Sequence, residues 1–419
     1  MRFAKLQMGL IASALLAAAQ LLPPINLVVD KVPADSSQFK LIVKGMKFKA
    51  AMHVLWNGQP RQTEFVDEYT LKAVITQDDL AMPALAKVSV YDDELSAVAS
   101  AEAAFAIYLP LVNNDLIYDP LRQRIYVSVS QNDVNGPSIA VYDPDGNTVD
   151  RYIPLTEEPG RLALSDDSRY LYIQLDQSSD HRLRRMDLTG VQADLDITLL
   201  QAGNLVPVMG FGPVPGQGAS VVVQFGATLE IVDNASPRPT SGGGNQCLIG
   251  VPDDSTFLTA SFDNLLAIKF SVGGIVFPLS FSPATYVGVS ACPVYATGRV
   301  YSQTGDVVDV SSPSPVQAGK FAASGMVGAA PEINRVYFIA SDLTPTLGPG
   351  APGSQARLLV FDSQTRDLLE TVALPTIVSV NQRNERLLHW GTDGIAFSEA
   401  EISSGQSRWI FLFHVPPPQ

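Results

Sequence analysis

The sequence predicts an all-β protein with two modules, a small sandwich followed by a larger ring of repeated sheets. Three observations support this fold class. The chain has 31 Gly and 30 Pro residues, spread along its length as the turns of an all-β protein require. Short strand-like segments alternate with turn residues throughout. From about residue 110 onward, an aromatic strand pattern recurs with a period of about 43 residues.

The composition is that of a folded, acidic chain. Hydrophobic residues make up 46% and charged residues 17% of the sequence, which argues against disorder. A length of 419 residues suits two domains, one small and one large. The formal net charge of −14 argues against nucleic acid as a partner, because polyanion binding depends on Lys and Arg.

Residues 1–19 are typical of an export signal peptide. Arg2 and Lys5 precede a mostly apolar run at 6–18, and the alanines at 17–19 offer small residues for cleavage. That run is too short to span a bilayer comfortably, and no later segment approaches ~20 continuous apolar residues, so no membrane span is expected. We expect an exported protein that is periplasmic, at the cell surface or extracellular. The alternative is a leader that stays uncleaved.

Residues 21–109 are predicted to form the small sandwich. The segment FKLIV at 39–43 ends at a Lys-Gly turn signal, and VLW at 54–56 runs into Asn57-Gly58, the dipeptide that best fits a type I′ hairpin turn. Further short strands are expected at 69–75, 86–91 and 104–108.

These segments resemble the IPT/TIG family of immunoglobulin-like modules. The resemblance covers about 85 residues and lies in FxLxVxGxxF at 39–48, VxWNG at 54–58, YxLxA at 69–73 and FxI at 105–107. The sequence departs from the family at 34–36, where such modules often carry a Gly. The family module is usually a spacer or an interaction platform, so the resemblance implies no chemistry. We interpret Trp56 as a core residue.

Residues 110–419 carry the repeated unit. Its best copy is RLALSDDSRYLY at 161–172, an apolar strand, a polar turn and an aromatic strand, and RLLHWG at 386–391 aligns with it without a gap. Tyr172 lies 46 residues after Tyr126 and 129 residues before Tyr301, which is three steps of 43. Two divergent units, around 221–225 and 257–262, fill that interval, so we count seven units.

This period predicts a β-propeller, in which each four-stranded sheet can bury its faces only against its neighbours. The predicted fold class is therefore all-β, an N-terminal immunoglobulin-like sandwich plus a seven-bladed β-propeller. The last repeat ends one strand short. Because a ring must close to remove its sheet edges, we expect residues 105–111 to supply the missing outer strand.

The repeat resembles bacterial propellers of the surface-antigen and lactonase-like type, whose blades carry SPDGRYLY and VxDxxTGxV motifs. Residues 165–172 match the first motif, and DLTG at 187–190 matches the second in part. The resemblance spans about 300 residues and implies a fold, because this superfold carries many functions.

The motifs predict no catalytic residues, no metal site and no cofactor. GPGAPG at 348–353 has the GxGxxG spacing, but Pro349 and Pro352 remove two backbone donors and no helical pattern follows, so we interpret 344–355 as a loop. DPDGN at 143–147 lacks the later Glu of an EF-hand and is interpreted as a hairpin turn.

His389 and Trp390 are the candidates for a binding site, because they lie on a predicted innermost strand that faces the central channel. Core packing is the competing interpretation. Cys247 and Cys292 are a candidate disulfide in an oxidising compartment, and the sequence leaves open whether they pair or remain two buried thiols.

Signal, module and propeller together favour an exported, non-enzymatic binding or scaffold protein that uses its propeller for protein, glycan or surface interaction. One alternative is a lactonase-like or lyase-type propeller hydrolase, whose dispersed active site no local motif would reveal. Another is a structural envelope component. The expected partner is therefore a protein or a glycan.

Overall fold

A computed structural model describes residues 24–177, 180–198, 200–201, 204–205, 208–225, 228–243, 247–253, 255–260, 265–279, 293–312, 315–341, 356–376, 386–400 and 407–415. These residues form strands, apart from turns, loops and two short 3₁₀ helices, η1 (Asp78–Leu80) and η2 (Pro331–Ile333). Among them, no helix is long and apolar enough to cross a membrane. Three features that the sequence predicts lie outside the described residues: the signal peptide at 1–19, the loop at 344–355 and the candidate disulfide. For the disulfide, this is because Cys292 and the side chain of Cys247 are not described.

The chain divides into two compact units. The first contains the residues up to Val29 together with 39–75 and 87–103, and the second contains 30–38, 76–86 and 104–419. Strand order in the first unit's four-stranded antiparallel sheet is β1-β3-β7-β6. These strands are β1 (Asn26–Leu27), β3 (Phe39–Lys44), β7 (Thr70–Ile75) and β6 (Thr63–Asp67).

The second sheet of this unit is built around β4 (Met52–Trp56), which pairs with β5 (Gln59–Pro60) and with β8 (Ala84–Asp92), and β8 pairs with β9 (Ala97–Val98). Asn57 and Gly58 join β4 to β5 with φ of 51° and 77°, the left-handed backbone that a type I′ turn requires. Trp56 is 2% exposed, so it is a core residue as predicted.

The second unit is a succession of antiparallel sheets of strands that follow one another in the chain, except that the last three strands join the first sheet where the final strand pairs with its innermost strand. The first three sheets contain β11 (Asn113–Asp119), β12 (Arg124–Val129), β13 (Ser138–Asp143) and β14 (Thr148–Pro154); β15 (Pro159–Leu164), β16 (Tyr170–Gln177), β17 (Asp180–Asp187) and β18 (Leu195–Thr198); and β21 (Val208–Val214), β22 (Gln217–Phe225), β23 (Thr228–Asp233), β24 (Ser236–Pro237) and β25 (Gly242–Gly243). A short hairpin of β19 (Leu200–Gln201) and β20 (Asn204–Leu205) precedes the third of these sheets.

The remaining sheets continue the same order. They contain β26 (Cys247–Asp253), β27 (Thr256–Ala260), β28 (Leu265–Ser271) and β29 (Gly274–Leu279); β30 (Val294–Ala296), β31 (Arg299–Tyr301), β32 (Asp306–Asp309) and β33 (Val316–Lys320); β34 (Met326–Ala330), β35 (Arg335–Ser341), β36 (Ala356–Asp362) and β37 (Leu368–Ala373); and β38 (Leu387–Trp390), β39 (Gly394–Ala400) and β40 (Ser407–His414). The two divergent repeats expected around 221–225 and 257–262 contribute β22 and β27, the second strands of their sheets.

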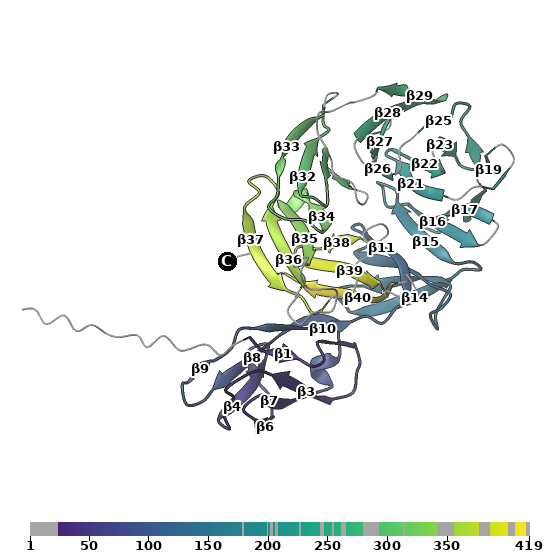
Figure 1. Cartoon of the computed structure of the whole chain (residues 1–419). Helices are drawn as coiled ribbons and strands as arrows, with labels where there is room; N and C mark the ends of the chain where they lie inside the picture. Colours follow the sequence, from purple (N-terminus) through teal and green to yellow (C-terminus); the bar gives the residue numbers. More distant parts are fainter. Residues whose placement is uncertain are drawn as a thin grey trace, which may run out of the picture. The chain divides into compact units, whose positions relative to one another are not determined.

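The first strands of successive sheets contact one another around a closed cycle. β11 contacts β15, and the contacts continue through β21, β26, β30, β34 and β38 before returning from β38 to β11. The sheets therefore stand around a common axis, and Figure 1 shows them following one another in chain order. A closed ring of mostly four-stranded antiparallel sheets is the architecture of a β-propeller.

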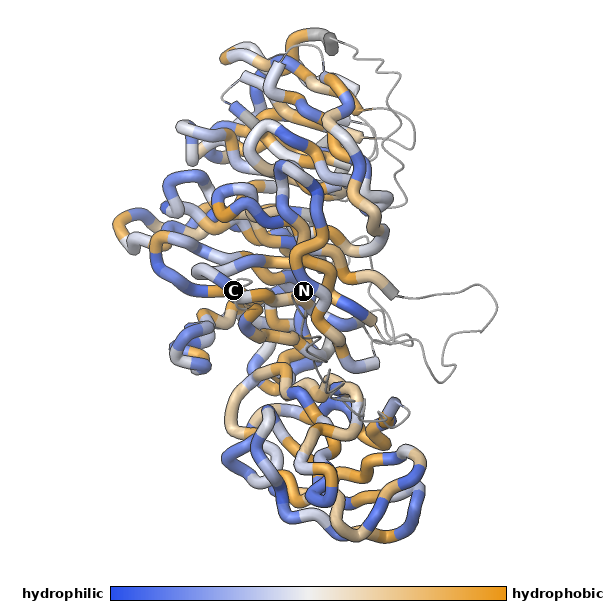
Figure 2. The backbone as a smooth tube through the Cα atoms, turned by 90° about the vertical axis from the view of Figure 1, so that its left-hand side faces the viewer, coloured by the Kyte–Doolittle hydropathy of each residue, from blue (hydrophilic) through white to orange (hydrophobic). Residues whose placement is uncertain are grey.

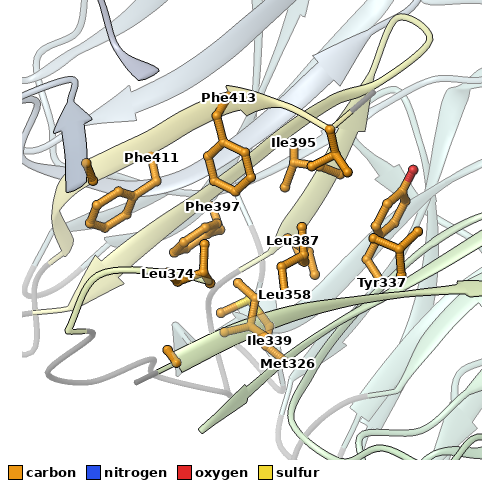
Figure 3. Packing of buried hydrophobic residues seen from close by; sticks show 14 of the residues in the cluster. Met326, Tyr337, Ile339, Leu358, Leu374, Leu387, Ile395, Phe397, Phe411 and Phe413 are labelled. Atoms are coloured by element: carbon orange, nitrogen blue, oxygen red, sulfur yellow. The ribbon is translucent and has the colours of Figure 1, made fainter. Parts of the chain in front are cut away.

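The core of the second unit lies between neighbouring sheets. Between the β34–β37 sheet and the β38–β40 sheet, Met326, Ile339 and Leu358 pack with Phe397 and Phe411 (Figure 3). Hydrophobic stretches follow the strands, and hydrophilic stretches lie at many of the connecting turns (Figure 2). Each sheet thus buries its faces against its neighbours, as the repeat pattern predicts.

The segment before β11 meets the last sheet at an isolated β-bridge and does not form a strand there. Leu109 and Ile410 exchange two backbone hydrogen bonds, with N···O distances of 2.9 and 3.0 Å, and Asn113 pairs with Ser407. The expectation of an outer strand from 105–111 is thus wrong, although Leu109 does meet the last sheet. The residues before Leu109 form β10 (Ala103–Tyr108), which pairs in parallel with β2 (Lys31–Pro33).

Lys31 anchors β2 to the last sheet of the ring. Its Nζ lies 2.8 Å from Oε2 of Glu399, donates to the carbonyl oxygen of Thr376 at 2.7 Å, and sits 4.9 Å from the ring centroid of Trp409. Glu399 is 1% exposed. A buried carboxylate with a close ammonium partner fixes the segment 30–38 on the ring.

Aspartates end several of the third strands. The Oδ1 atoms of Asp143, Asp187 and Asp362 accept a hydrogen bond from the backbone N–H two residues on, at 3.1, 2.8 and 2.8 Å. These bonds form an Asx turn, which leads the chain into the fourth strand. The segment at 143–147 is therefore a hairpin turn between β13 and β14, as predicted.

Candidate functional site

The axis of the ring holds a cavity of about 700 Å³. Every first strand of the ring contributes to its wall, through Ile117, Arg161, Phe211, Leu248, Val294, Met326 and Leu388. This volume lies in the range of sites for small organic molecules. The cavity is therefore the natural candidate site.

Of the ionisable side chains that line the cavity, three come from consecutive sheets. They are Arg386 just before β38, Asp115 on β11 and Arg161 on β15. A second carboxylate, that of Glu332 in η2, also lines the cavity, and its side chain is 64% exposed. Each is followed by a leucine, and these leucines (Leu116, Leu162 and Leu387) are buried at 1%, 0% and 7% exposure. Successive side chains of a strand point to opposite sides, so the buried leucine leaves its predecessor free to face the cavity. We call Asp115, Arg161 and Arg386 the charged level.

Asp115 is the centre of the charged level. Its Oδ2 accepts a hydrogen bond from the backbone N–H of Leu162 at 2.8 Å and lies 3.1 Å from Nη2 of Arg386, and its Oδ1 accepts from the N–H of Leu116 at 2.9 Å. The same Nη2 donates to the carbonyl oxygen of Leu162 at 2.6 Å. Arg161 donates to the carbonyl oxygen of Met209 at 3.3 Å. These bonds fix the three groups on strand backbone.

Burial and mutual charge set the protonation of this level. Burial raises the pKa of Asp115, while Arg386, the N–H groups and Arg161 act against the rise. Burial lowers the pKa of Arg161, Asp115 raises it, and the nearby Arg386 lowers it again. The two guanidinium groups thus share one carboxylate and repel each other.

The remaining first strands give the cavity a mostly apolar wall. Phe211, Leu248, Val294 and Met326 come from β21, β26, β30 and β34. The cavity wall therefore has two parts. It is charged where three consecutive sheets line it, and it is mostly apolar where the other first strands line it.

His389 also lines the cavity, on β38 and three residues beyond Arg386. Its ring stacks on Tyr337 with centroids 6.0 Å apart, and its Nδ1 lies 3.8 Å from Oε1 of Glu332. Burial lowers the pKa of His389, so the imidazole is neutral at pH 7. Its buried Nε2 makes no hydrogen bond with any described residue.

The structure separates the two residues that the sequence singles out. His389 faces the cavity, whereas Trp390 is 2% exposed and packs in the core with Leu116 and Leu412. The opposite directions of the two side chains follow from strand alternation.

Sequence reasoning missed the charged level itself. The gapless match of 161–172 with the segment from 386 puts Arg161 and Arg386 at one repeat position, which was the available signal. Asp115 occupies the equivalent place in the first repeat, but its chemistry differs from that of arginine. Only the ring brings the three together.

No family model and no curated protein matches the chain. Among solved structures, it is similar to Citrobacter koseri AztD, at 11% identity over 80% of this chain and 95% of that chain, with a TM-score of 0.45. It is also similar to a β-propeller domain from Myceliophteria thermophila, at 11% identity over 71% and 96%, with a TM-score of 0.43. A third is dihydro-heme d1 dehydrogenase NirN in complex with DHE, at 14% identity over 78% and 71%, with a TM-score of 0.43. At these low values, the fold assignment rests on the ring of sheets itself.

Proposed function

We propose that the protein is an exported, non-enzymatic binding protein, and that the cavity on the ring axis is its ligand site. One observation carries this proposal: three ionisable side chains converge, from consecutive sheets, on a cavity of about 700 Å³. Charged groups are costly to bury, and their convergence in a cavity is typical of functional sites. The sequence predicts a protein or glycan partner, whereas the cavity favours a small organic ligand.

The architecture proposed with this function has three parts. Residues 1–19 are the signal peptide, 21–109 an IPT/TIG-type immunoglobulin-like domain, and 110–419 a seven-bladed β-propeller. The closed cycle of first-strand contacts supports the ring, and Leu109 bridges to the last blade. The Asn57-Gly58 hairpin and the two antiparallel sheets of the first unit support the immunoglobulin-like domain.

Export predicts a defined mature N-terminus. Mass spectrometry of the protein expressed with its own leader in a bacterial host should find a chain that begins near Gln20 outside the cytoplasm. Exported protein that retains Met1, or protein that stays in the cytoplasm, would contradict the signal peptide.

Ligand binding in the cavity can be tested by thermal shift on the mature protein with a panel of neutral, cationic and anionic small molecules. A ligand that binds only the folded state raises Tm. Leu388→Trp fills the cavity, and Leu368→Trp places the same side chain at an exposed position, 53% exposed on β37. We expect compounds that raise the Tm of the wild type and of Leu368→Trp but leave that of Leu388→Trp unchanged. Shifts that persist in Leu388→Trp would place binding elsewhere.

A lactonase-like or lyase-type hydrolase is the second candidate. The observation that favours it is His389, a neutral imidazole at the cavity whose Nε2 has no hydrogen-bond partner among the described residues. Such a group can accept a proton as a general base. A lactone and ester hydrolysis screen tests it, with His389→Gln as the variant. Activity that His389→Gln abolishes would replace the binding proposal.

A further inference from the structure

The charges of the charged level are unequal in number, and the other carboxylate that lines the cavity, Glu332 in η2, is 64% exposed. The charged level holds two guanidinium groups, on Arg161 and Arg386, and one carboxylate, on Asp115. Guanidinium groups stay protonated at physiological pH, so the loss of a proton does not relieve their repulsion. The repulsion is also seen in the pKa of Arg161, which the nearby Arg386 lowers. An anion placed between the two arginines offsets it.

The carboxylate oxygens of Asp115 already have hydrogen-bond and ion-pair partners within the protein. They accept two backbone N–H groups and lie against Nη2 of Arg386. On Arg386, by contrast, the Nε and Nη1 atoms make no hydrogen bond with any described residue, and the side chain keeps 35% of its surface exposed. Because guanidinium donors form a planar fork, they fit a carboxylate with two parallel hydrogen bonds.

The rest of the ring indicates what the anion is attached to. Phe211, Leu248 and Val294 face the cavity from β21, β26 and β30, which lie outside the charged sheets. Apolar side chains stabilise a ligand by removing its apolar surface from water. A free inorganic anion would leave these side chains without a function in binding.

Building on the proposed role of the cavity as the ligand site, we propose that its ligand is a small organic monoanion. A carboxylate is held by Arg161 and Arg386, and an apolar body attached to it contacts Leu248 and Val294. One negative charge matches the single excess positive charge of the level. Asp115 is a positioning residue, because it holds Arg386 in place without touching the ligand.

Two sets of probes of matched shape test this inference. The first set is octanoate, 1-octanol and octylammonium, and the second is 3-phenylpropanoate, 3-phenylpropanol and 3-phenylpropylammonium, with inorganic phosphate as an anion without an apolar body. Isothermal titration calorimetry on the mature protein at pH 7 measures each Kd. We expect at least one carboxylate to bind at least tenfold more tightly than its alcohol, its ammonium analogue and phosphate.

Three variants connect this preference to the charged level. Arg161→Gln and Arg386→Gln should each weaken carboxylate binding by roughly 10- to 100-fold, the range for one charge-assisted hydrogen bond, while leaving the Kd of the alcohol unchanged. Arg151→Gln, at an exposed arginine on β14, is the control and should change neither. Arg386→Lys keeps the positive charge and loses the planar guanidinium donors. It should therefore weaken carboxylate binding, while the carboxylate still binds more tightly than the alcohol. This last variant serves if the glutamine variants fail to fold.

The outcomes distinguish a failure of the anion inference from a failure of the proposed function of the cavity. If an alcohol or an ammonium probe binds as tightly as its carboxylate, and Leu388→Trp abolishes that binding, the cavity is a ligand site but the anion inference is wrong. If phosphate binds as tightly as the carboxylates, the claim that the ligand carries an apolar body is wrong. If no probe binds, or if Leu388→Trp changes nothing, the proposed function of the cavity fails as well.

Discussion

Asp115 shows how a single residue can organise the site. Its carboxylate is 3% exposed, and it bridges two first strands by accepting the N–H of Leu162 on the neighbouring strand. It also holds Arg386, which belongs to the other neighbouring sheet. Because the Arg386 side chain is 35% exposed, the loss of the Asp115 carboxylate would chiefly leave the N–H groups of Leu116 and Leu162 without their acceptor.

Asp115→Ala should therefore lower the free energy of unfolding by about 1–3 kcal/mol, the cost of a buried group left without its hydrogen bond. Asp115→Asn should cost less, because its amide oxygen still accepts a backbone N–H. Urea denaturation measures both. Asp150→Ala is the control, since Asp150 is 40% exposed in its pair with Arg124, and an exposed pair contributes at most about 1 kcal/mol. Equal losses at the two positions would contradict the structural role of Asp115.

At the scale of elements, strand alternation and Asx turns account for most of the repeat. The strand segment SIAVYD at 138–143 is predicted from the sequence and coincides with β13 (Ser138–Asp143). The Asn57-Gly58 turn is likewise predictable, because few dipeptides tolerate two positive φ angles. These features are local, so the sequence reveals them. The side of a first strand that faces the axis depends on packing between sheets, and no local pattern reveals it.

The turn at Asp187 provides a test at this scale. The Thr189 hydroxyl, the N–H groups of Thr189 and Gln192, and Arg169 together lower the pKa of Asp187 from its ordinary value of 3.8 to about 2, against a smaller opposing effect of burial. A lowered carboxylate pKa stabilises the fold above the unfolded-state value, and this contribution is lost as the pH falls toward the folded-state value.

Asp187→Asn should thus destabilise the protein most at pH 6, and the difference from wild type should shrink as the pH falls from 4 toward 2. Urea midpoints of both proteins, measured at intervals between pH 6 and pH 2.5, follow this difference. The control is Asp166→Asn, the same substitution at an aspartate of the polar turn between β15 and β16. If the difference in urea midpoint between Asp187→Asn and wild type stays constant over this range, the negative charge of Asp187 does not contribute to stability.

At the scale of the whole molecule, the ring creates the candidate site. Arg161 lies 46 residues after Asp115, and Arg386 lies 225 residues further on, so ring closure is what joins the last sheet to the first. The sequence predicts a closing strand at 105–111, but Leu109 makes a single bridge there, because the apolar run at 103–108 belongs to β10. The sequence also puts His389 on a first strand, where it does line the cavity. The charged level escapes sequence analysis because its members lie at equivalent positions of distant repeats, which only the closed ring brings together.

A crystal structure of the mature protein with its best-binding carboxylate probe tests the central claim most directly. The account predicts the ligand in the cavity on the ring axis, with its carboxylate within hydrogen-bond distance of Arg161 and Arg386 and its apolar body against Leu248 and Val294. A carboxylate bound on the outer surface of the ring, or one that turns its apolar end toward Arg386, would contradict it.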